Sequence, residues 1–193
     1  MKEETNPKYM QLLATGRELF WKYGFKKVSI QEICERAGIS KMTYYRFFEN
    51  KVELAKAVFD KEASQGVVEV KNILKEKSLP SEKIKKIIMM KQNGTTGISK
   101  EFLKDFYTSS GDGLKEFIEE KTKKLWQEML VDFKKAQKKG VFRKDMKPEF
   151  LFFMSQKGSE MITDERLLRL YKNPQDLLVE FSNFVAYGIS PHK

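Results

Sequence analysis

The sequence predicts an all-α protein, in which an N-terminal three-helix domain is joined by a long helix to a C-terminal helical bundle. Apolar residues recur at helical spacing along most of the 193 residues, and few segments alternate as strands do. Helix caps and glycine stops punctuate residues 1–50. With 40% hydrophobic and 12% aromatic residues, the chain can bury a real core.

The first helix is expected to start at Pro7 and to end before Gly24. A single apolar stripe runs along this segment, Asn6 can cap its start, and proline fits a first helical turn. Gly24 is expected to stop the helix in a left-handed conformation.

Two short helices follow the first one. Ser29 and Glu32 form the pattern of a capping box, and the helix that they begin ends at Gly38. Ser40 can cap the next helix, which runs to Phe48. Two short helices joined by a tight glycine-containing turn predict a helix-turn-helix.

Longer helices are expected beyond this motif. A connecting helix should run from Val52 to about Lys77 and break near Pro80. Periodicity predicts the remaining helices over 81–91, 99–109, 113–139, from Pro148 to about Thr163, and from Pro174 onward. Glycine-containing segments at 93–97 and 109–113 separate three of them, and Gly140 stops the longest.

The sequence holds few residues suited to catalysis. Its one histidine is His192, next to last, which removes catalytic triads and histidine-ligated metals. No glycine-rich phosphate loop is present. Cys34 lies on an apolar helix face, where a thiol is inert packing. We therefore predict no enzyme activity, no catalytic residue, no metal and no cofactor, although chemistry based on carboxylates or lysine stays open.

The charge balance suggests a polyanionic partner, although net charge alone does not choose among nucleic acid, a membrane surface and plain solubility. The chain has 37 Lys and Arg against 27 Asp and Glu, a formal charge of +10. Its longest apolar run, Phe150 to Met154, is far shorter than the roughly 20 residues that span a bilayer, so no membrane contact is expected. A polar N-terminus and a lone thiol favour the cytoplasm.

Residues around the helix-turn-helix resemble the DNA-binding domain of the tetracycline-repressor (TetR) family. The resemblance rests on the segments 19–25, 29–33 and 37–54, whose glycines and caps are in register with that domain. Met42, Tyr44 and Phe47 depart from it, since the family commonly has a small residue, Leu, and His or Tyr there. The resemblance implies a DNA-binding domain over residues 1–50 and a ligand-binding and dimerisation domain over 51–193.

In this family the third helix enters the major groove, with its N-terminal residues nearest the base edges. The resemblance places Thr43 and Tyr45 on phosphates or sugars, and Lys51 on a phosphate. Arg46 is the expected guanine contact, because arginine binds guanine in a bidentate way. The predicted DNA-binding residues are Ser29, Lys41, Met42, Thr43, Tyr45, Arg46 and Lys51. Tyr44 is expected in the core, and plain capping or solvated charge remains the alternative for several of the others.

The resemblance also implies a small-molecule effector and a homodimer. A soft aromatic lining suits a largely apolar or cationic effector, and the candidate lining residues are Met89, Met90, Phe102, Phe106, Tyr107, Trp126, Met129 and Phe133. The candidate dimer contacts are Leu151, Phe152, Met154, Met161, Leu177, Leu178, Phe181, Phe184 and Val185. Both sets could instead pack inside one subunit.

The expected function is therefore that of a bacterial, ligand-responsive transcriptional regulator in the cytoplasm, associated with the nucleoid when bound to DNA. A repressor that binds a palindromic operator as a homodimer and leaves it on effector binding is favoured, while activation stays open. The alternatives are a helical carrier or enzyme that retains the motif as packing, and a DNA-binding regulator without a small ligand.

Overall fold

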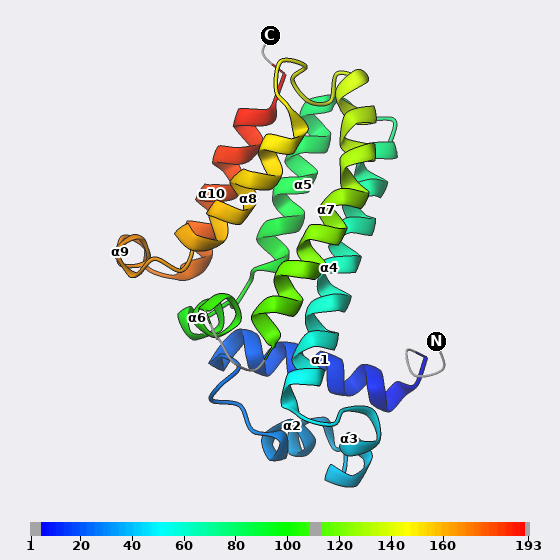
Figure 1. The fold of residues 1–193 in the computed structure, drawn as a ribbon, viewed down its shortest axis with the longest axis vertical. Coiled ribbons are helices and arrows are strands. Elements are labelled where there is room, and N and C mark those ends of the chain that lie inside the picture. Colours follow the sequence, from blue (N-terminus) through cyan, green and yellow to red (C-terminus); the bar gives the residue numbers. More distant parts are fainter. Residues whose placement is uncertain (1–4, 109–112, 192–193) are drawn as a thin grey trace. The chain divides into compact units, whose positions relative to one another are not determined.

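The computed structural model describes residues 5–108 and 113–191, apart from the side chain of Ser159. These residues form helices and no strand (Figure 1). His192 and the predicted separator at 109–112 lie outside them. The helices are α1 (Pro7–Tyr23), α2 (Ile30–Ala37), α3 (Lys41–Phe47), α4 (Lys51–Lys75), α5 (Pro80–Gly94), α6 (Lys100–Thr108), α7 (Leu114–Lys138), α8 (Pro148–Met161), α9 (Glu165–Leu168) and α10 (Pro174–Ile189).

The helical prediction is confirmed, with differences at three places. Helix α5 continues to Gly94, into the predicted separator. The four-residue α9 was not predicted, because one turn is too short to show a hydrophobic period. Its start is set by Asp164, whose carboxylate accepts a hydrogen bond from Arg166 N at 2.8 Å. Gly24 has φ +83° and ψ 162°, so it stops α1 with a positive φ but not in the left-handed helical conformation that was predicted.

The chain forms two compact units. Unit 1 comprises residues up to Glu62 together with Gly97–Glu120, and unit 2 comprises Ala63–Thr96 and Lys121–Lys193. Helices α4 and α7 contribute residues to both units. These units reflect packing, whereas the division predicted at residue 50 concerns binding roles and stays a prediction.

Unit 1 has a core rich in aromatic rings. Helix α1 packs on α2 and on α6, and α2 packs on α3. Trp21 of α1 lies against Phe102 of α6, with ring centroids 4.2 Å apart, and Phe106 lies 4.2 Å from Phe102. Phe20 is fully buried beside them. Apolar burial of this size fixes α6 onto the helix-turn-helix domain.

Tyr44 anchors α3 to the rest of unit 1. Its ring is fully buried, as predicted, and its hydroxyl donates to Asn50 O at 3.1 Å. Burial raises the pKa of this phenol, so the hydroxyl remains a donor. A phenylalanine or leucine here would leave the Asn50 carbonyl without that partner.

The loop between α1 and α2 is held from two sides. At the start of α4, the Lys51 ammonium donates to Phe25 O and Val28 O, each at 2.7 Å, and to Lys26 O at 3.3 Å. The same ammonium lies 4.5 Å from the centroid of the Phe25 ring. From α6, the buried Asp105 carboxylate accepts a hydrogen bond from Lys26 N at 2.8 Å. Two helices from distant parts of the sequence thus fix the entry into α2.

Only glycine fits where this loop leaves α1. A Cβ atom on Gly24 would lie 2.8 Å from Asp105 Oδ2 and 2.8 Å from Glu101 Cβ, besides facing the positive φ. The close approach of α6 therefore explains this glycine as much as the helix stop does.

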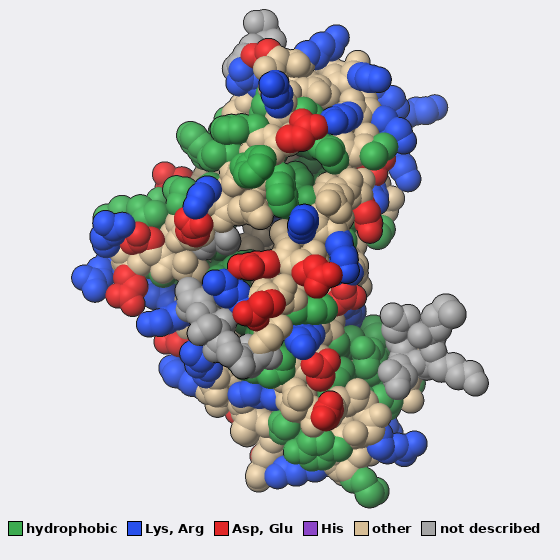
Figure 2. Space-filling model, viewed as in Figure 1, with side chains coloured by type: hydrophobic (Ala, Val, Ile, Leu, Met, Phe, Trp, Pro, Cys, Tyr) green, Lys and Arg blue, Asp and Glu red, His purple; other side chains and the backbone are tan. Residues whose placement is uncertain are grey.

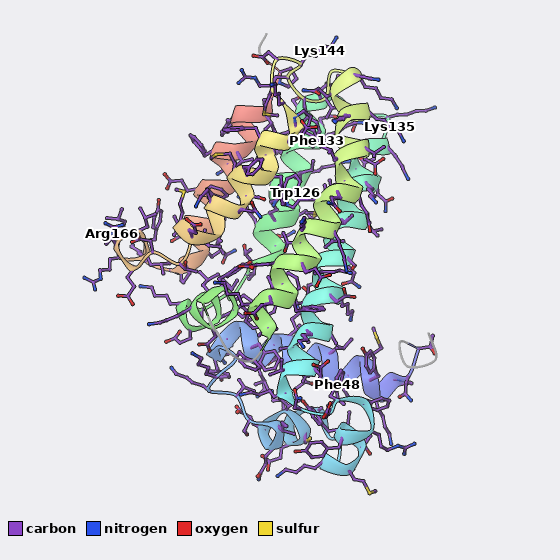
Figure 3. The ribbon with its side chains drawn as sticks, in the orientation of Figure 1. Phe48, Trp126, Phe133, Lys135, Lys144 and Arg166 are labelled. Atoms are coloured by element: carbon purple, nitrogen blue, oxygen red, sulfur yellow. The ribbon has the colours of Figure 1, made fainter. Side chains whose placement is uncertain are left out.

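Unit 2 is a bundle with one apolar core. The core combines residues of α4, α5, α7, α8 and α10, and includes Leu74, Ile84, Phe133, Leu151 and Ala186. The ring of Phe133, which is labelled in Figure 3, stacks on that of Phe142, with ring centroids 4.1 Å apart. Between α8 and α10 the packing is tight, because a Cβ on Gly158 would lie 2.4 Å from Phe181 Cζ.

Replacing Lys51 by methionine should destabilise the fold, because the carbonyls of residues 25, 26 and 28 would lose their shared donor. We expect the free energy of unfolding to fall by about 1–3 kcal/mol. Lys61→Met is the matched control, since Lys61 is half-buried on the same helix. Urea unfolding followed by circular dichroism measures both, and equal effects would contradict this role for Lys51.

Gly158→Ala and Gly66→Ala should have opposite effects on stability. The first adds a methyl group against the Phe181 ring and should cost about 1–3 kcal/mol. The second adds it to open space on α4, and should gain about 0.5–1 kcal/mol from helix propensity. Thermal unfolding midpoints decide, and a stabilised Gly158→Ala variant would show that the α8–α10 contact is loose.

Candidate nucleic-acid interface

Helix α3 presents a polar and accessible face. Ser40 caps the helix, with its Oγ accepting from Thr43 N at 3.2 Å and lying 3.0 Å from Thr43 Oγ1. The side chains of Met42 and Tyr45 are 78% and 55% exposed, and those of Lys41 and Arg46 are exposed too. Tyr44 points into the core, whereas these exposed side chains are accessible to a ligand, although the Tyr45 ring also contacts that of Tyr44.

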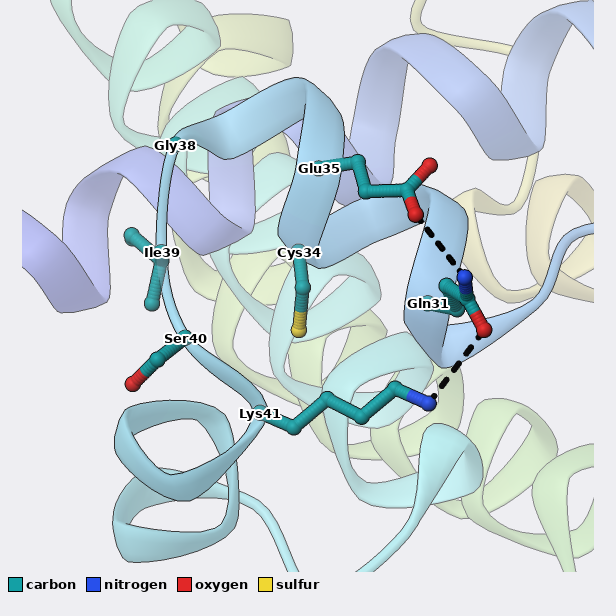
Figure 4. A pocket seen from close by; sticks show the side chains of 7 residues that line it. All are labelled: Gln31, Cys34, Glu35, Gly38, Ile39, Ser40 and Lys41. Carbon is teal, nitrogen blue, oxygen red and sulfur yellow. Dashed lines mark hydrogen bonds between the residues drawn. The ribbon is translucent and has the colours of Figure 1, made fainter.

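A polar row crosses the notch between α2 and α3 (Figure 4). Gln31 Nε2 donates to Glu35 Oε1 at 2.9 Å, and Lys41 Nζ donates to Gln31 Oε1 at 3.4 Å. Cys34 lines the same notch and is buried. Burial raises the pKa of its thiol while the Lys41 charge opposes the shift, so the thiol stays protonated at neutral pH.

Two of the predicted DNA contacts have structural roles of their own. Ser29 caps α2, with its Oγ accepting from Glu32 N at 3.1 Å. The three hydrogen bonds of Lys51 to loop carbonyls match the three N–H groups of an ammonium. Burial lowers the pKa of Lys51, and Asp105 opposes this shift. The phosphate contact predicted for Lys51 therefore competes with bonds that hold the loop.

The surplus of positive charge does not lie in the unit that carries the helix-turn-helix. The sequence of unit 1 has 15 Lys and Arg and 15 Asp and Glu, whereas that of unit 2 has 22 and 12. Attraction of a polyanion to α3 therefore depends on the positions of individual Lys and Arg side chains and not on the net charge of unit 1.

The predicted effector residues are divided between the units. Phe102 and Phe106 are core residues of unit 1, so they follow the alternative in which they pack inside one subunit. Tyr107 is half-buried in the same unit. Met90, Trp126, Met129 and Phe133 belong to the core of unit 2 or pack against it. Met89 is 50% exposed on α5. No single compact unit brings the set together.

The predicted dimer contacts lie on the predicted helices but not all on one face. Leu151 and Leu177 are buried inside unit 2. Phe152 packs on Trp126, with ring centroids 6.1 Å apart. Phe184 and Met161 are 69% and 42% exposed, and Met154, Leu178, Phe181 and Val185 are half-buried.

Three exposed aromatic residues on these helices were missed. Phe150, Phe153 and Tyr187 are 55%, 63% and 74% exposed. Phe150, Met154, Phe184 and Val185 line an apolar groove between α8 and α10, and Figure 2 shows hydrophobic side chains gathered over these helices. Helix α8 is apolar on more than one side, so the sequence could have revealed these residues once Leu151 was assigned to the core.

The described ranges contain no cluster of three or more His, Cys, Asp and Glu residues arranged to hold a metal ion. Within those same ranges, no helix combines the length and apolar character that crossing a membrane requires.

Comparison with known proteins identifies the N-terminal region. Residues 12–58 match the model of the bacterial regulatory proteins of the tetR family. The fatty acid metabolism regulator protein of Bacillus subtilis (strain 168) is 27% identical over 86 residues, which cover 45% of this chain and 44% of that protein. The chain thus spans less than half the length of this curated relative in the matched segment.

Solved structures share the whole fold. A fatty acid degradation regulator, FadR, from Bacillus halodurans has a TM-score of 0.70 at 17% identity, covering 95% of this chain and 97% of that chain. FadR from Bacillus subtilis in complex with stearoyl-CoA has a TM-score of 0.66 at 18% identity, covering 94% and 99%. The regulatory protein TetR from Rhodobacter sphaeroides has a TM-score of 0.70 at 18% identity, covering 95% and 100%.

The sequence match covers most of α1, all of α2 and α3, and the start of α4. It includes Tyr44 and Lys51, whose hydrogen bonds hold these helices together. In residues 12–58 this chain therefore resembles the bacterial regulatory proteins of the tetR family.

Proposed function

We propose that this chain is a homodimeric transcriptional regulator that binds palindromic operator DNA through α3 and releases it when a small effector binds. Repression is the favoured outcome, because an occupied operator blocks the polymerase. In this proposal the protein works in the cytoplasm of a bacterium and catalyses no reaction.

One observation carries the DNA-binding part of the proposal. Tyr44 fixes α3 to the core, while Lys41, Met42, Tyr45 and Arg46 remain exposed on the same two turns. An ammonium, a phenol and a guanidinium are donors to phosphates and base edges. If the helix-turn-helix served only for packing, the buried Tyr44 would be explained but the exposed side chains of α3 would not. The carrier or enzyme alternative is therefore less favoured.

The effector proposal comes from the relatives. One similar protein is named a fatty acid metabolism regulator, and one similar structure holds stearoyl-CoA. We propose a long-chain acyl-CoA as the effector of this chain too. The acyl chain of this ligand suits the predicted apolar lining. Its headgroup is anionic, so it requires cationic side chains and not an aromatic lining that binds a cationic ligand. A lysine-rich unit 2 supplies such cations.

The proposed dimer interface is the apolar surface of α8 and α10. Several large exposed apolar side chains on two helices of one small unit are more than scattered surface residues, and they mark a protein contact. A two-fold dimer places two α3 helices on successive major grooves only if their separation is near one turn of DNA, roughly 34 Å.

The DNA-binding part is tested with a duplex selected from a random pool by the full-length chain. We expect a palindromic sequence, and Arg46→Ala should reduce discrimination at one base pair of each half-site by about tenfold or more. Arg166→Ala is the control, because the Arg166 side chain is 90% exposed on α9 (Figure 3). A wild-type chain that binds all duplexes equally at moderate salt would overturn the proposal.

The effector part uses the same duplex in a fluorescence anisotropy titration. Stearoyl-CoA should release the DNA, whereas coenzyme A alone should not, because it lacks the apolar chain. A bound complex unaffected by acyl-CoAs of every chain length would refute this effector class while leaving DNA binding intact.

Phe153→Asp and Phe184→Asp should convert the dimer to monomers, because each places a charge in an apolar contact. Leu170→Asp is the control, since Leu170 is 74% exposed but lies between α9 and α10. Sedimentation velocity gives the oligomeric state. Dimers that persist in both phenylalanine variants would assign the interface to another surface.

A further inference from the structure

Nearly all of the positive surplus of unit 2 lies at one end of its bundle. The segments 75–86 and 134–147 hold 12 Lys and Arg but 3 Asp and Glu, compared with 22 and 12 in the whole unit. Lys71 Nζ of α4 lies 3.8 Å from Asp132 Oδ2 of α7, so these helices run side by side just before both segments. Figure 2 shows Lys and Arg side chains gathered around the end of α7. We call these two segments the basic end.

Few acidic groups balance the cations of the basic end. The Glu76 carboxylate forms a salt bridge with Lys86, and that of Asp145 forms one with Arg143. Glu82 closes the capping box of α5. Within the part of the chain that the structure describes, exposed lysines of both segments remain without a salt bridge, and they include Lys77, Lys138, Lys139, Lys144 and Lys147.

The loop between α7 and α8 holds part of this charge in a fixed place. Gln137 Nε2 donates to Arg143 O at 2.7 Å and to Met146 O at 2.8 Å. Phe142 is buried, and Arg143 N donates to Ile189 O of α10 at 3.0 Å. A loop that is already fixed loses little conformational entropy when its lysines bind a partner.

Helix stability explains only part of this pattern. Lys135 and Lys138 lie in the last turn of α7, where a cation interacts favourably with the helix dipole. Lys147, however, is the N-cap residue of α8 and makes no capping bond, and a cation is unfavourable at a helix N-terminus. Lys144 lies in the loop, outside any helix (Figure 3). Like charges gathered in this way destabilise the fold, which indicates that they bind a polyanion.

Double-stranded DNA is the polyanion that fits the basic end best. Protein interfaces are depleted in lysine and enriched in aromatic residues. Binding at a membrane surface requires an apolar face, but Leu79, at 64% exposed, is the only large hydrophobic residue exposed within these two described segments. Lysine is a compact point charge that contacts phosphates without reading bases.

We propose that the basic end binds the phosphate backbone of a DNA duplex, without base preference, as a second contact in addition to α3. Lys135, Lys138 and Lys139 are three and four residues apart on one helix, so their side chains are neighbours and can contact neighbouring phosphates. A chain whose α3 holds the operator can then hold a second duplex. This inference goes beyond operator binding and does not depend on base reading by α3.

The experiment measures the affinity of the full-length chain for a labelled duplex of random sequence, by fluorescence anisotropy at several salt concentrations. The basic-end variant combines Lys138→Gln, Lys144→Gln and Lys147→Gln. The slope of log affinity against log salt should shrink by about 3, because each lost phosphate contact removes about 0.9. A slope equal to that of the wild type would overturn the inference.

A matched control removes the same charge from exposed lysines of unit 2 outside the basic end. It combines Lys123→Gln, Lys157→Gln and Lys172→Gln, and its slope should change little. Equal slopes in the two triple variants would assign the effect to net charge and overturn the inference. Circular dichroism confirms folding, and Lys144→Gln alone, with an expected change of about 1, keeps the test decisive if the triple variant misfolds.

A bridging assay tests the second duplex directly. The selected duplex is attached to beads and loaded with the wild-type chain, which should then retain the labelled random duplex at low salt. The basic-end variant should bind the beads equally, with the same base preference, but retain much less random duplex. A wild-type chain that retains none, or a variant that retains as much, would contradict a second contact.

Other partners are distinguished with the same variants. Phosphatidylserine vesicles and polyglutamate are the probes for a membrane surface and for an acidic protein. If binding to either probe depends on the three lysines while the salt slopes on DNA are equal, the basic end has that other partner and this inference is overturned. A wild-type chain without base preference overturns the proposed function alone, since the random duplex still tests the basic end.

Discussion

The arrangement of unit 1 depends on one ammonium group. Lys51 is the first residue of α4, and its ammonium donates hydrogen bonds to carbonyl groups of the loop between α1 and α2. Backbone carbonyl groups that point the same way repel one another unless they share a hydrogen-bond donor. By supplying that donor, Lys51 joins the ends of three helices at one point. Asp105 adds the opposite charge from α6, through the Lys26 amide. The orientation of α2, and with it the notch that leads into α3, follows from this junction.

This junction also connects α6 to the backbone that leads into α2. Asp105 belongs to α6, which lies more than seventy residues beyond the loop in the sequence but within the same compact unit. A movement of α6 would pull on the same backbone that Lys51 holds. The two units carry charge unequally, because the surplus of Lys and Arg lies in the sequence of unit 2. In the proposed function, this surplus attracts DNA over a distance, and a few cations of unit 1 make the contacts.

Structural features that depend on residues close together in the sequence could be predicted from local sequence patterns. Caps at Ser29 and Ser40 could be derived from spacing, and the inward position of Tyr44 from helical phase together with the resemblance, and the structure confirms them. The role of Lys51 could not, because the carbonyls that it binds lie in a loop more than twenty residues earlier. On α8, apolar residues on several sides left the phase undetermined, so Leu151 was predicted either as a dimer contact or as packing inside one subunit, and the exposed Phe153 was not named.

In the proposed function, DNA binds at the rim formed by α2 and α3. This binding is tested most directly by amide chemical shifts of the isotope-labelled chain during titration with the selected duplex. We expect the largest changes at residues 29–31 and 40–46, with small changes on α8 and α10. Changes centred on the lysine-rich surface of unit 2, with α3 unaffected, would contradict it.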